Sequence, residues 1–183
     1  MEVFIISSCR DEINADYIIL ARKIAKFLAE NECNLIFGGA STSMMGVCYK
    51  VFEKYQRNIS VYTTPEYLED LKNLPAAKGY IYRTSFERLQ HMYEACDLLV
   101  VLPGGPGTIA ELTSCIDEKR SNGKNVPIII YDENEYYKKL LEIYDKFIEE
   151  KFCGASIKDT FIYTQNMEEF TNAYYECQKN MKK

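Results

Sequence analysis

The segment from Pro103 to Glu111 has the composition of an anion-binding turn, because it reads Pro-Gly-Gly-Pro-Gly-Thr-Ile-Ala-Glu. Glycines let backbone N–H groups approach an anion closely, and the N-terminus of the helix that follows adds a partial positive charge. A phosphate therefore fits here without a lysine. Thr108 can cap the helix or bond a phosphate oxygen. A tight turn followed by a capped helix is the alternative explanation of the same spacing.

Two charged residues accompany this segment. Glu111 lies one turn into the expected helix, where a carboxylate stabilises the helix dipole but repels a phosphate. A carboxylate directed at a sugar hydroxyl or a developing positive charge explains it better, and a purely helix-stabilising glutamate is the alternative. Arg88 lies in the first turn of the preceding helical segment, so a parallel sheet would bring both side chains to one edge. An exposed helix arginine is the alternative for Arg88.

Other polar or glycine-rich segments also stand just after predicted strands, where ligands bind in a parallel sheet. These segments are Ser7-Ser8 and Gly38-Gly39. Neither the Gly-x-Gly-x-x-Gly dinucleotide fingerprint nor the Gly-x4-Gly-Lys-Ser/Thr phosphate loop occurs in the sequence. A conventional dehydrogenase or NTPase therefore loses its main support.

The single histidine and the seven cysteines give no sign of a catalytic or metal centre. The cysteine count is odd and no Cys-x-x-Cys occurs, which favours reduced, mostly buried thiols. His91 has no acid or nucleophile that the sequence places beside it, so we interpret it as an incidental helix residue. We predict no metal site.

The elements that must position these residues alternate between short apolar runs and helical stripes. Strands are expected at 3–6, 34–37, 59–62, 80–83, 98–102, 126–131 and 161–163, and helices at 17–30, 44–55, 84–95, 108–122, 135–151 and 167–178. The stretch 63–78 contains two prolines and is expected to be a loop with one helical turn. Thr84 and Glu87 have the spacing of a capping box.

This alternation predicts the fold class. The unbroken apolar run 98–102 is typical of a central parallel strand that is buried on both faces. Strands joined by crossover helices indicate a Rossmann-like three-layer α/β/α fold with a mostly parallel sheet. No linker or internal repeat interrupts the chain, so we predict a single domain over residues 1–183.

The composition restricts the partners. With 47% hydrophobic and 27% charged residues, a net charge of −5 and a pI near 5.1, the chain lacks the basic surface that general nucleic-acid binding needs. No apolar run approaches the roughly 20 residues of a membrane span. The first seven residues lack the basic start of a signal peptide. We therefore expect a cytoplasmic protein that binds neither nucleic acid nor membrane.

The motifs together resemble those of a known family. Residues 103–111 fit the Pro-Gly-Gly-x-Gly-Thr-x-x-Glu signature of the Lonely Guy (LOG) proteins. Ser85–Met92 is similar to the family's Met-x-x-Arg-Lys-x-x-Met segment and retains Arg88 and Met92. Phe37–Gly46 resembles its Gly-Gly-Gly-x-x-Gly-Leu-Met-Gly loop. With the element order included, the resemblance covers nearly the whole chain.

The resemblance implies a homodimeric hydrolase that cleaves the N-glycosidic bond of a nucleoside 5′-monophosphate, such as AMP or a cytokinin riboside monophosphate. The products would be the free base and ribose 5-phosphate, and no cofactor would be needed. Arg88 and Glu111 would be the catalytic residues. The expected substrate- and phosphate-binding residues are Ser8, Gly38, Gly39, Met92, Gly104, Gly105, Gly107 and Thr108. Family members have also been labelled lysine decarboxylases, but nothing in the sequence indicates a lysine that would hold PLP, and we reject that label.

The chain also departs from the family pattern. The departures are Ser85 for the first Met, Leu89 for the motif lysine, Ala40 and Ser43 for loop glycines, and Glu118 for a common Trp. Loss of a substrate-side cation can alter the substrate or weaken catalysis. The alternative function is a non-catalytic nucleotide or ADP-ribose-type sensor, or a carrier of a phosphorylated cofactor. The Tyr-rich helix at 136–147 is a candidate dimer surface, with core packing as its alternative.

Overall fold

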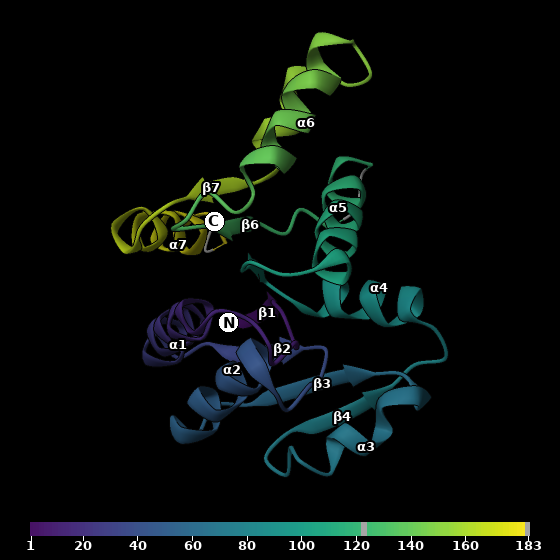
Figure 1. Cartoon of the computed structure of the whole chain (residues 1–183), viewed down its shortest axis with the longest axis vertical. Coiled ribbons are helices and arrows are strands. Elements are labelled where there is room, and N and C mark those ends of the chain that lie inside the picture. The colour runs from purple at the N-terminus through teal and green to yellow at the C-terminus, as the bar shows by residue number, and fades with distance from the viewer. Residues whose placement is uncertain (122–123, 182–183) are drawn as a thin grey trace.

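The computed structural model describes residues 1–121 and 124–181, and its seven strands form one sheet (Figure 1). The strands are β1 (Glu2–Ile6), β2 (Asn34–Phe37), β3 (Ile59–Thr63), β4 (Lys78–Ile81), β5 (Leu98–Val101), β6 (Ile128–Tyr131) and β7 (Ile162–Thr164). Their order is β4-β3-β2-β1-β5-β6-β7, and each of these pairings is parallel. The predicted three-layer α/β fold is confirmed.

Helices connect the strands as expected from the alternating pattern. They are α1 (Ala15–Glu30), α2 (Ser43–Lys54), α3 (Leu68–Leu71), α4 (Ser85–Ala95), α5 (Pro106–Arg120), α6 (Lys138–Glu149) and α7 (Met167–Met181), with short 3-10 turns η1 (Pro65–Tyr67) and η2 (Ala155–Thr160). The helical turn expected within 63–78 corresponds to η1 and α3. α5 begins two residues earlier than predicted, because proline fits the first helical turn, where its missing N–H costs no hydrogen bond.

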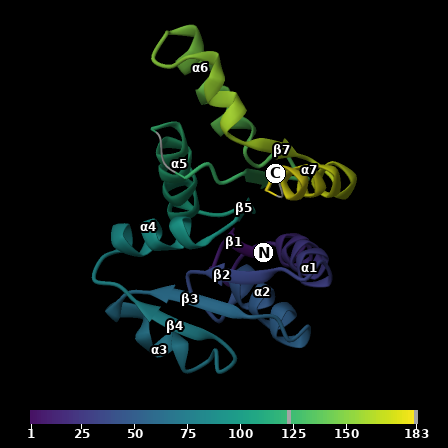
Figure 2. The ribbon, with the colours of Figure 1, turned by 180° about the vertical axis from the view of Figure 1, so that it is seen from behind.

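Two helical layers cover the sheet, with α1, α2 and α7 on one face and α4 and α5 on the other (Figures 1 and 2). Alternate residues of β1 divide between the layers, as the period of a strand requires. Val3 and Ile5 belong to the buried cluster that contains Leu28 of α1, whereas Phe4 and Ile6 belong to the cluster of α5. All four residues of β5 are buried, which confirms the prediction of a central strand.

α6 projects from the end of the molecule (Figure 1). Tyr144 is the one buried residue within this helix, while Ile143 and Phe147 on it are exposed. The Tyr-rich segment therefore contributes little to the core through α6 itself. No helix in residues 1–121 or 124–181 is long and apolar enough to cross a membrane.

Candidate active site

The carboxyl edge of the sheet contains a crevice between β1 and β5. β1 leads into α1 on one face, and β5 leads into α5 on the other, so the two connections diverge from neighbouring strands. Such a switch point is where ligands bind in an open parallel sheet. Ser7 and Ser8 follow β1 here, and the glycine loop, residues 102–107, follows β5.

The glycine loop delivers the chain directly to the N-terminus of α5. Gly105 is the extended N-cap residue and Pro106 is the first helical residue. A Cβ on Gly104 would lie 2.1 Å from Oγ1 of Thr108, so this position requires glycine. A Cβ on Gly105 or Gly107 would meet nothing within 4 Å, so this side of the loop is open. The N–H groups in the first turn of a helix are donors of the kind that bind anions, which is the chemistry that the sequence predicted here.

Arg88 and Glu111 form an ion pair at the same edge. Nη2 of Arg88 donates to Oε1 of Glu111 at 2.9 Å, and the side chains are only 15% and 16% exposed. Burial raises the pKa of the Glu111 carboxyl, while the charge and hydrogen bond of Arg88 oppose this rise. The pairing confirms that the two predicted catalytic side chains meet.

Local structure explains the position of Arg88. Thr84 caps α4, because its side chain accepts from the N–H of Glu87 at 3.2 Å, as the capping-box pattern predicted. Glu87 in turn accepts from the N–H of Arg83 at 3.0 Å, one residue before the cap. Arg88 then lies in the first turn of α4. Its Nη1 lies 3.9 Å from where a Cβ of Gly38 would be, which is ordinary van der Waals distance, so the guanidinium lies beside the loop after β2.

Two polar atoms near this crevice are buried without hydrogen-bond partners among the described residues, Oγ of Ser7 and Nε of Arg88. An unpaired buried polar group costs about 1 to 3 kcal/mol. Such groups are rare in folded proteins, and each needs an explanation such as a function. Their presence beside the glycine loop and the ion pair is a further sign of a functional site.

A cavity of about 200 Å³ borders the glycine loop. It is lined by Ser8, Arg10, Ile13, Tyr17, Met44, Pro103, Gly104, Gly105 and Tyr136. Sequence reasoning identified Ser8, Gly104 and Gly105 but missed Arg10, Tyr17 and Tyr136. Arg10 and Tyr17 stand in the loop and first helical turn after β1, so the rule that ligands meet strand ends could have found them.

The remaining predicted residues have varied positions. Gly39 has a φ of +91°, and a Cβ there would lie 2.4 Å from Val61, so it serves the backbone turn after β2. Met92 is completely buried in the core on the face of the sheet that α4 and α5 cover. Neither Met92 nor the other buried residues of that cluster line the cavity beside the glycine loop. His91 stacks on Tyr82 with ring centroids 4.6 Å apart. Leu89, in the place of the motif lysine, lines a groove between α4 and α5.

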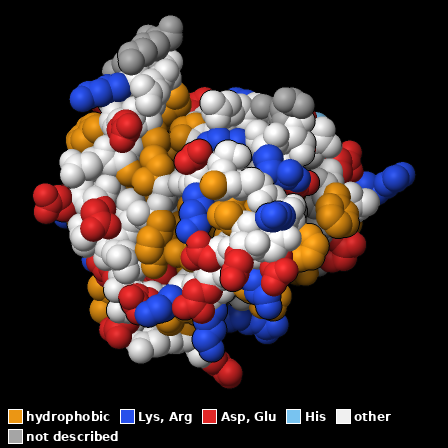
Figure 3. Space-filling view, turned by 90° about the horizontal axis from the view of Figure 1, so that it is seen from above, with side chains coloured by type: hydrophobic (Ala, Val, Ile, Leu, Met, Phe, Trp, Pro, Cys, Tyr) orange, Lys and Arg blue, Asp and Glu red, His pale blue; other side chains and the backbone are white. Residues whose placement is uncertain are grey.

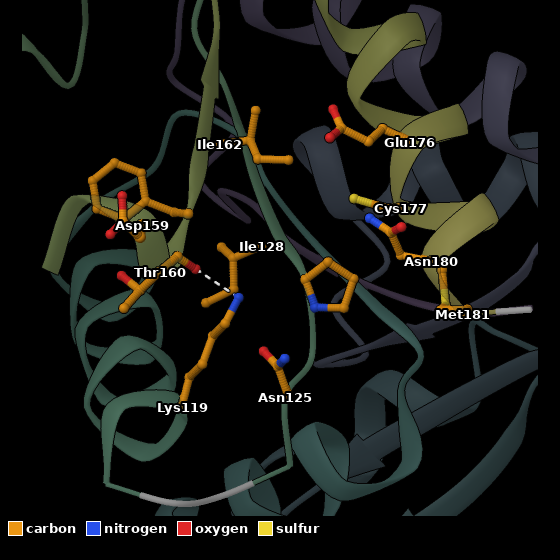
Figure 4. Close-up of a pocket in the computed structure, with 12 residues that line it drawn as sticks. Lys119, Asn125, Ile128, Asp159, Thr160, Ile162, Glu176, Cys177, Asn180 and Met181 are labelled. Carbon is orange, nitrogen blue, oxygen red and sulfur yellow. Dashed lines mark hydrogen bonds between the residues drawn. The ribbon is translucent and has the colours of Figure 1, made fainter. Parts of the chain in front are cut away.

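A second cavity, of about 340 Å³, lies at the opposite edge of the sheet, beside the first residues of β6 and β7 (Figure 4). Lys119 extends into it and donates to the carbonyl of Thr160 at 2.9 Å. None of the predicted site residues lines this cavity. The carboxyl-edge crevice is therefore the better candidate for the active site.

The face shown in Figure 3 carries both signs of charge, with basic (blue) and acidic (red) side chains interspersed among hydrophobic (orange) ones. Among the side chains coloured there, no continuous basic surface is visible. In the part of the chain that the structure describes, no group of three or more His, Cys, Asp or Glu side chains is arranged to hold a metal ion.

The parallel sheet, the glycine loop at its switch point and the buried Arg88–Glu111 pair define a Rossmann-like protein whose glycine loop leads into a helix N-terminus. A family model described as "Possible lysine decarboxylase" matches residues 41–174. "Probable cytokinin riboside 5'-monophosphate phosphoribohydrolase LOG4" of Oryza sativa subsp. japonica is 30% identical over 158 residues, 86% of this chain and 69% of that protein. LOG5 of Arabidopsis thaliana, a cytokinin riboside 5'-monophosphate phosphoribohydrolase by name, is 26% identical over 155 residues, 84% and 68% of the two chains. The chain belongs to this LOG family of hydrolases.

Solved structures resemble the fold more widely. The molybdenum cofactor carrier protein of Chlamydomonas reinhardtii has a TM-score of 0.71 at 14% identity, covering 97% of this chain and 98% of that one. DNA processing protein A of Helicobacter pylori has a TM-score of 0.62 at 13% identity, covering 96% and 80%. At such low identity the likeness shows the fold alone.

Proposed function

We propose that this protein hydrolyses the N-glycosidic bond of a nucleoside 5′-monophosphate, with AMP or a cytokinin riboside monophosphate as the substrate class. The observation that carries the proposal is the buried ion pair between Arg88 of α4 and Glu111 of α5, with 2.9 Å between Nη2 and Oε1. The glycine loop leads into α5. The names of the LOG relatives support the same reaction. Water is the only co-reactant.

The 5′-phosphate would bind at the N-terminus of α5. A Cβ added at Gly105 or Gly107 would meet nothing within 4 Å, and Thr108 lies directly beside Gly104. Backbone donors and the helix dipole favour a doubly charged phosphate without a lysine. Gly104 would contribute by allowing the close packing of the loop. Ser8, Gly38 and Gly39 remain predicted substrate-side residues, whereas the complete burial of Met92 leaves it no surface for a ligand.

Glu111 would act on the ribose. As the C1′–N bond breaks, its electron pair leaves with the base and positive charge develops on C1′ and the ring oxygen. A carboxylate positioned against that charge stabilises the transition state, as in glycoside hydrolysis. Water then adds its hydroxyl to C1′, and its proton balances the departing base. The products are the free base and ribose 5-phosphate.

Arg88 would keep Glu111 ionised and orient the phosphate or sugar. Its guanidinium opposes the rise in the carboxyl pKa that burial causes. Nε of Arg88 has no hydrogen-bond partner among the described residues, so the ion pair does not use every donor of the guanidinium. The same side chain can therefore serve both the ion pair and the substrate.

A non-catalytic nucleotide sensor or phosphorylated-cofactor carrier is the second candidate. Leu89, which lines the α4–α5 groove in the place of the family lysine, favours it because a cation is lost. Incubating the purified protein with AMP and other monophosphates, and assaying free base and ribose 5-phosphate, separates the two functions. Tight nucleotide binding without release of any base would refute the hydrolase.

A homodimer and a cytoplasmic location complete the proposal. The groove between α4 and α5 is lined by Leu89 and Tyr93, and Phe86 beside it is 84% exposed. A large apolar side chain exposed at a groove is typical of an interface. We infer that a second copy covers this groove, which native mass spectrometry tests. The free cysteines agree with a reducing compartment.

A further inference from the structure

The turn after β6 is fixed by one buried carboxylate. Asp132 is 0% exposed and accepts three hydrogen bonds of 2.8 Å, from the N–H groups of Tyr136 and Tyr137 and from the hydroxyl of Tyr163. Its own N–H donates to the carbonyl of Thr164 at 2.9 Å. Because a buried carboxylate is stable only with its oxygens hydrogen-bonded, the positions of its three donors are tightly constrained.

The two tyrosines of this turn reach the glycine loop. The Tyr137 hydroxyl donates to the carbonyl of Leu102 at 2.7 Å, and the Tyr136 hydroxyl donates to the carbonyl of Gly104 at 2.7 Å. Tyr137 is completely buried, whereas Tyr136 is half-exposed and lines the cavity beside the loop. Asp132 therefore holds Tyr136 and Tyr137, and their hydroxyls hold two carbonyl groups of the loop after β5.

Holding a carbonyl also fixes an N–H group. In a trans peptide the C=O of one residue and the N–H of the next point in opposite directions. When Tyr136 binds the carbonyl of Gly104, the N–H of Gly105 must point away from the tyrosine hydroxyl. Gly105 is the N-cap of α5, where N–H groups are available to an anion. The hydroxyl of Tyr136 therefore sets the direction of a phosphate-binding donor that it does not touch.

Glycine makes such support necessary. A loop with glycine at three of the four positions from 104 to 107 has many accessible backbone conformations, and ordering each residue costs conformational entropy. If the ligand had to order the loop, that cost would reduce its affinity. Hydrogen bonds from a rigid neighbouring turn remove this cost before the ligand arrives.

We propose that Asp132, Tyr136 and Tyr137 form a positioning unit that holds the glycine loop in its anion-binding conformation. The identity of the anion, a nucleotide 5′-phosphate, rests on the proposed function, but the ordering of the loop does not. Tyr136 is the specificity-related member of the unit, since its ring borders the cavity while its hydroxyl orients the loop.

The first test measures loop order without any ligand. In Tyr136→Phe and Tyr137→Phe, the backbone ¹⁵N order parameters of Gly104 and Gly105 should fall from about 0.85 to below about 0.7. The chain has only nine glycines, so their amide signals can be assigned. Tyr55→Phe is the matched control, because its hydroxyl donates to Glu30 at 2.8 Å at the surface. Unchanged loop order parameters in both variants would overturn the inference.

The second test measures affinity by calorimetry. Loss of one hydrogen bond that pre-orders the loop should weaken binding of AMP and of inorganic phosphate by about three- to tenfold in Tyr136→Phe. Adenosine should bind unchanged, since the ring is retained. Equal weakening for adenosine and AMP would refute positioning through the loop. A wild-type protein that binds no nucleotide would refute the proposed function, while the order parameters still decide the inference.

Asp132→Asn extends the test to the carboxylate. An amide nitrogen cannot accept, so one hydrogen bond is lost if it replaces Oδ1 and two if it replaces Oδ2, and the same glycines should become more mobile. If this variant fails to fold, the two tyrosine variants carry the test. If it folds and the loop stays ordered, Asp132 has no part in the positioning unit.

Discussion

Replacing Glu111 with glutamine separates chemistry from binding, because it removes a charge and keeps the shape. In the native pair, Oε1 accepts from Nη2 of Arg88 at 2.9 Å. A hydrogen bond to a charged group contributes about 1.5 to 3 kcal/mol, and the glutamine oxygen retains part of it. This loss is offset because glutamine buries no charge at a position where burial raises the carboxyl pKa, so we expect the free energy of unfolding to change by at most about 1 kcal/mol and Tm by at most roughly 4 °C at this chain length. The variant should therefore remain folded.

Turnover should fall much further. A group preorganised against transition-state charge contributes about 3 to 4 kcal/mol, so we expect kcat to decrease by about 100- to 1,000-fold. Binding of AMP should not weaken, because the phosphate is held by the N-terminus of α5. Removing a carboxylate from the second turn also reduces its repulsion of the phosphate. The Kd for AMP should therefore stay the same or fall.

Single-turnover release of free base, followed by chromatography, gives the rate, and calorimetry gives the Kd. Asp117→Asn is the matched control, because it removes a carboxylate from the same helix that is 67% exposed and paired with Arg120. The control should keep native activity. A decrease in kcat of less than about tenfold, below the range of a positioned catalytic group, would refute the role of Glu111. So would an increase in Kd that matches the loss of rate.

Three further outcomes are expected. Burial raises the pKa of Glu111, and the ionised carboxylate is the active form, so kcat/KM should decline as pH falls through a midpoint above 4.5, the ordinary pKa of a glutamate. A midpoint at or below pH 4.5 would contradict this prediction. Because the pKa of Glu111 is raised in the folded protein, folding favours its protonated carboxyl. The contribution of Glu111 to stability is therefore present below the ordinary pKa of a glutamate and is lost as pH rises through the pKa of the folded state. Thermal unfolding should show this pH dependence in the wild type and not in Glu111→Gln. In Gly104→Ala the new Cβ would lie 2.1 Å from the Thr108 hydroxyl, so we expect AMP binding to weaken at least about tenfold. Gly105→Ala has open space for its Cβ and should leave Tm unchanged. Equal losses of Tm in the two variants would refute this steric explanation. Phe86→Glu should convert a dimer to a monomer in native mass spectrometry, and an unchanged mass would exclude this surface as the interface.

The sequence predicted the fold well because its signals are local. Apolar runs, helical stripes and a capping box depend on neighbouring residues, and β5 and α4 formed as expected. Among the strands, the largest deviation is β4, which begins at Lys78 instead of Tyr80 and ends at Ile81 instead of Arg83. As an edge strand it is largely exposed, so its extent is set by pairing with β3 through Ser60 and Lys78 and not by an apolar pattern.

The site was predicted only where a strand end or motif marked it. The glycine loop and the meeting of Arg88 with Glu111 followed from the topology of a parallel sheet. The hydrogen bonds that link Asp132 through Tyr136 to the glycine loop were missed. They join segments about 30 positions apart, and no sequence motif relates the two segments. Asp132 stands directly after β6, as Ser7 stands after β1, so the rule used for the other strands would have identified it.

The pairing of β1 with β5 also determines when the site can exist during synthesis of the chain. β1 hydrogen-bonds to β2 early in the sequence, but Val3 also pairs with Leu98, and the N–H of Glu2 donates to Asp97 across 95 positions. Contacts of such long separation form slowly, because the intervening chain must be closed into a loop. Until β5 arrives, β1 presents an unpaired edge to other chains. The crevice therefore cannot form before β5 and the glycine loop have been synthesised, and a nascent chain is inactive and open to wrong pairing until then.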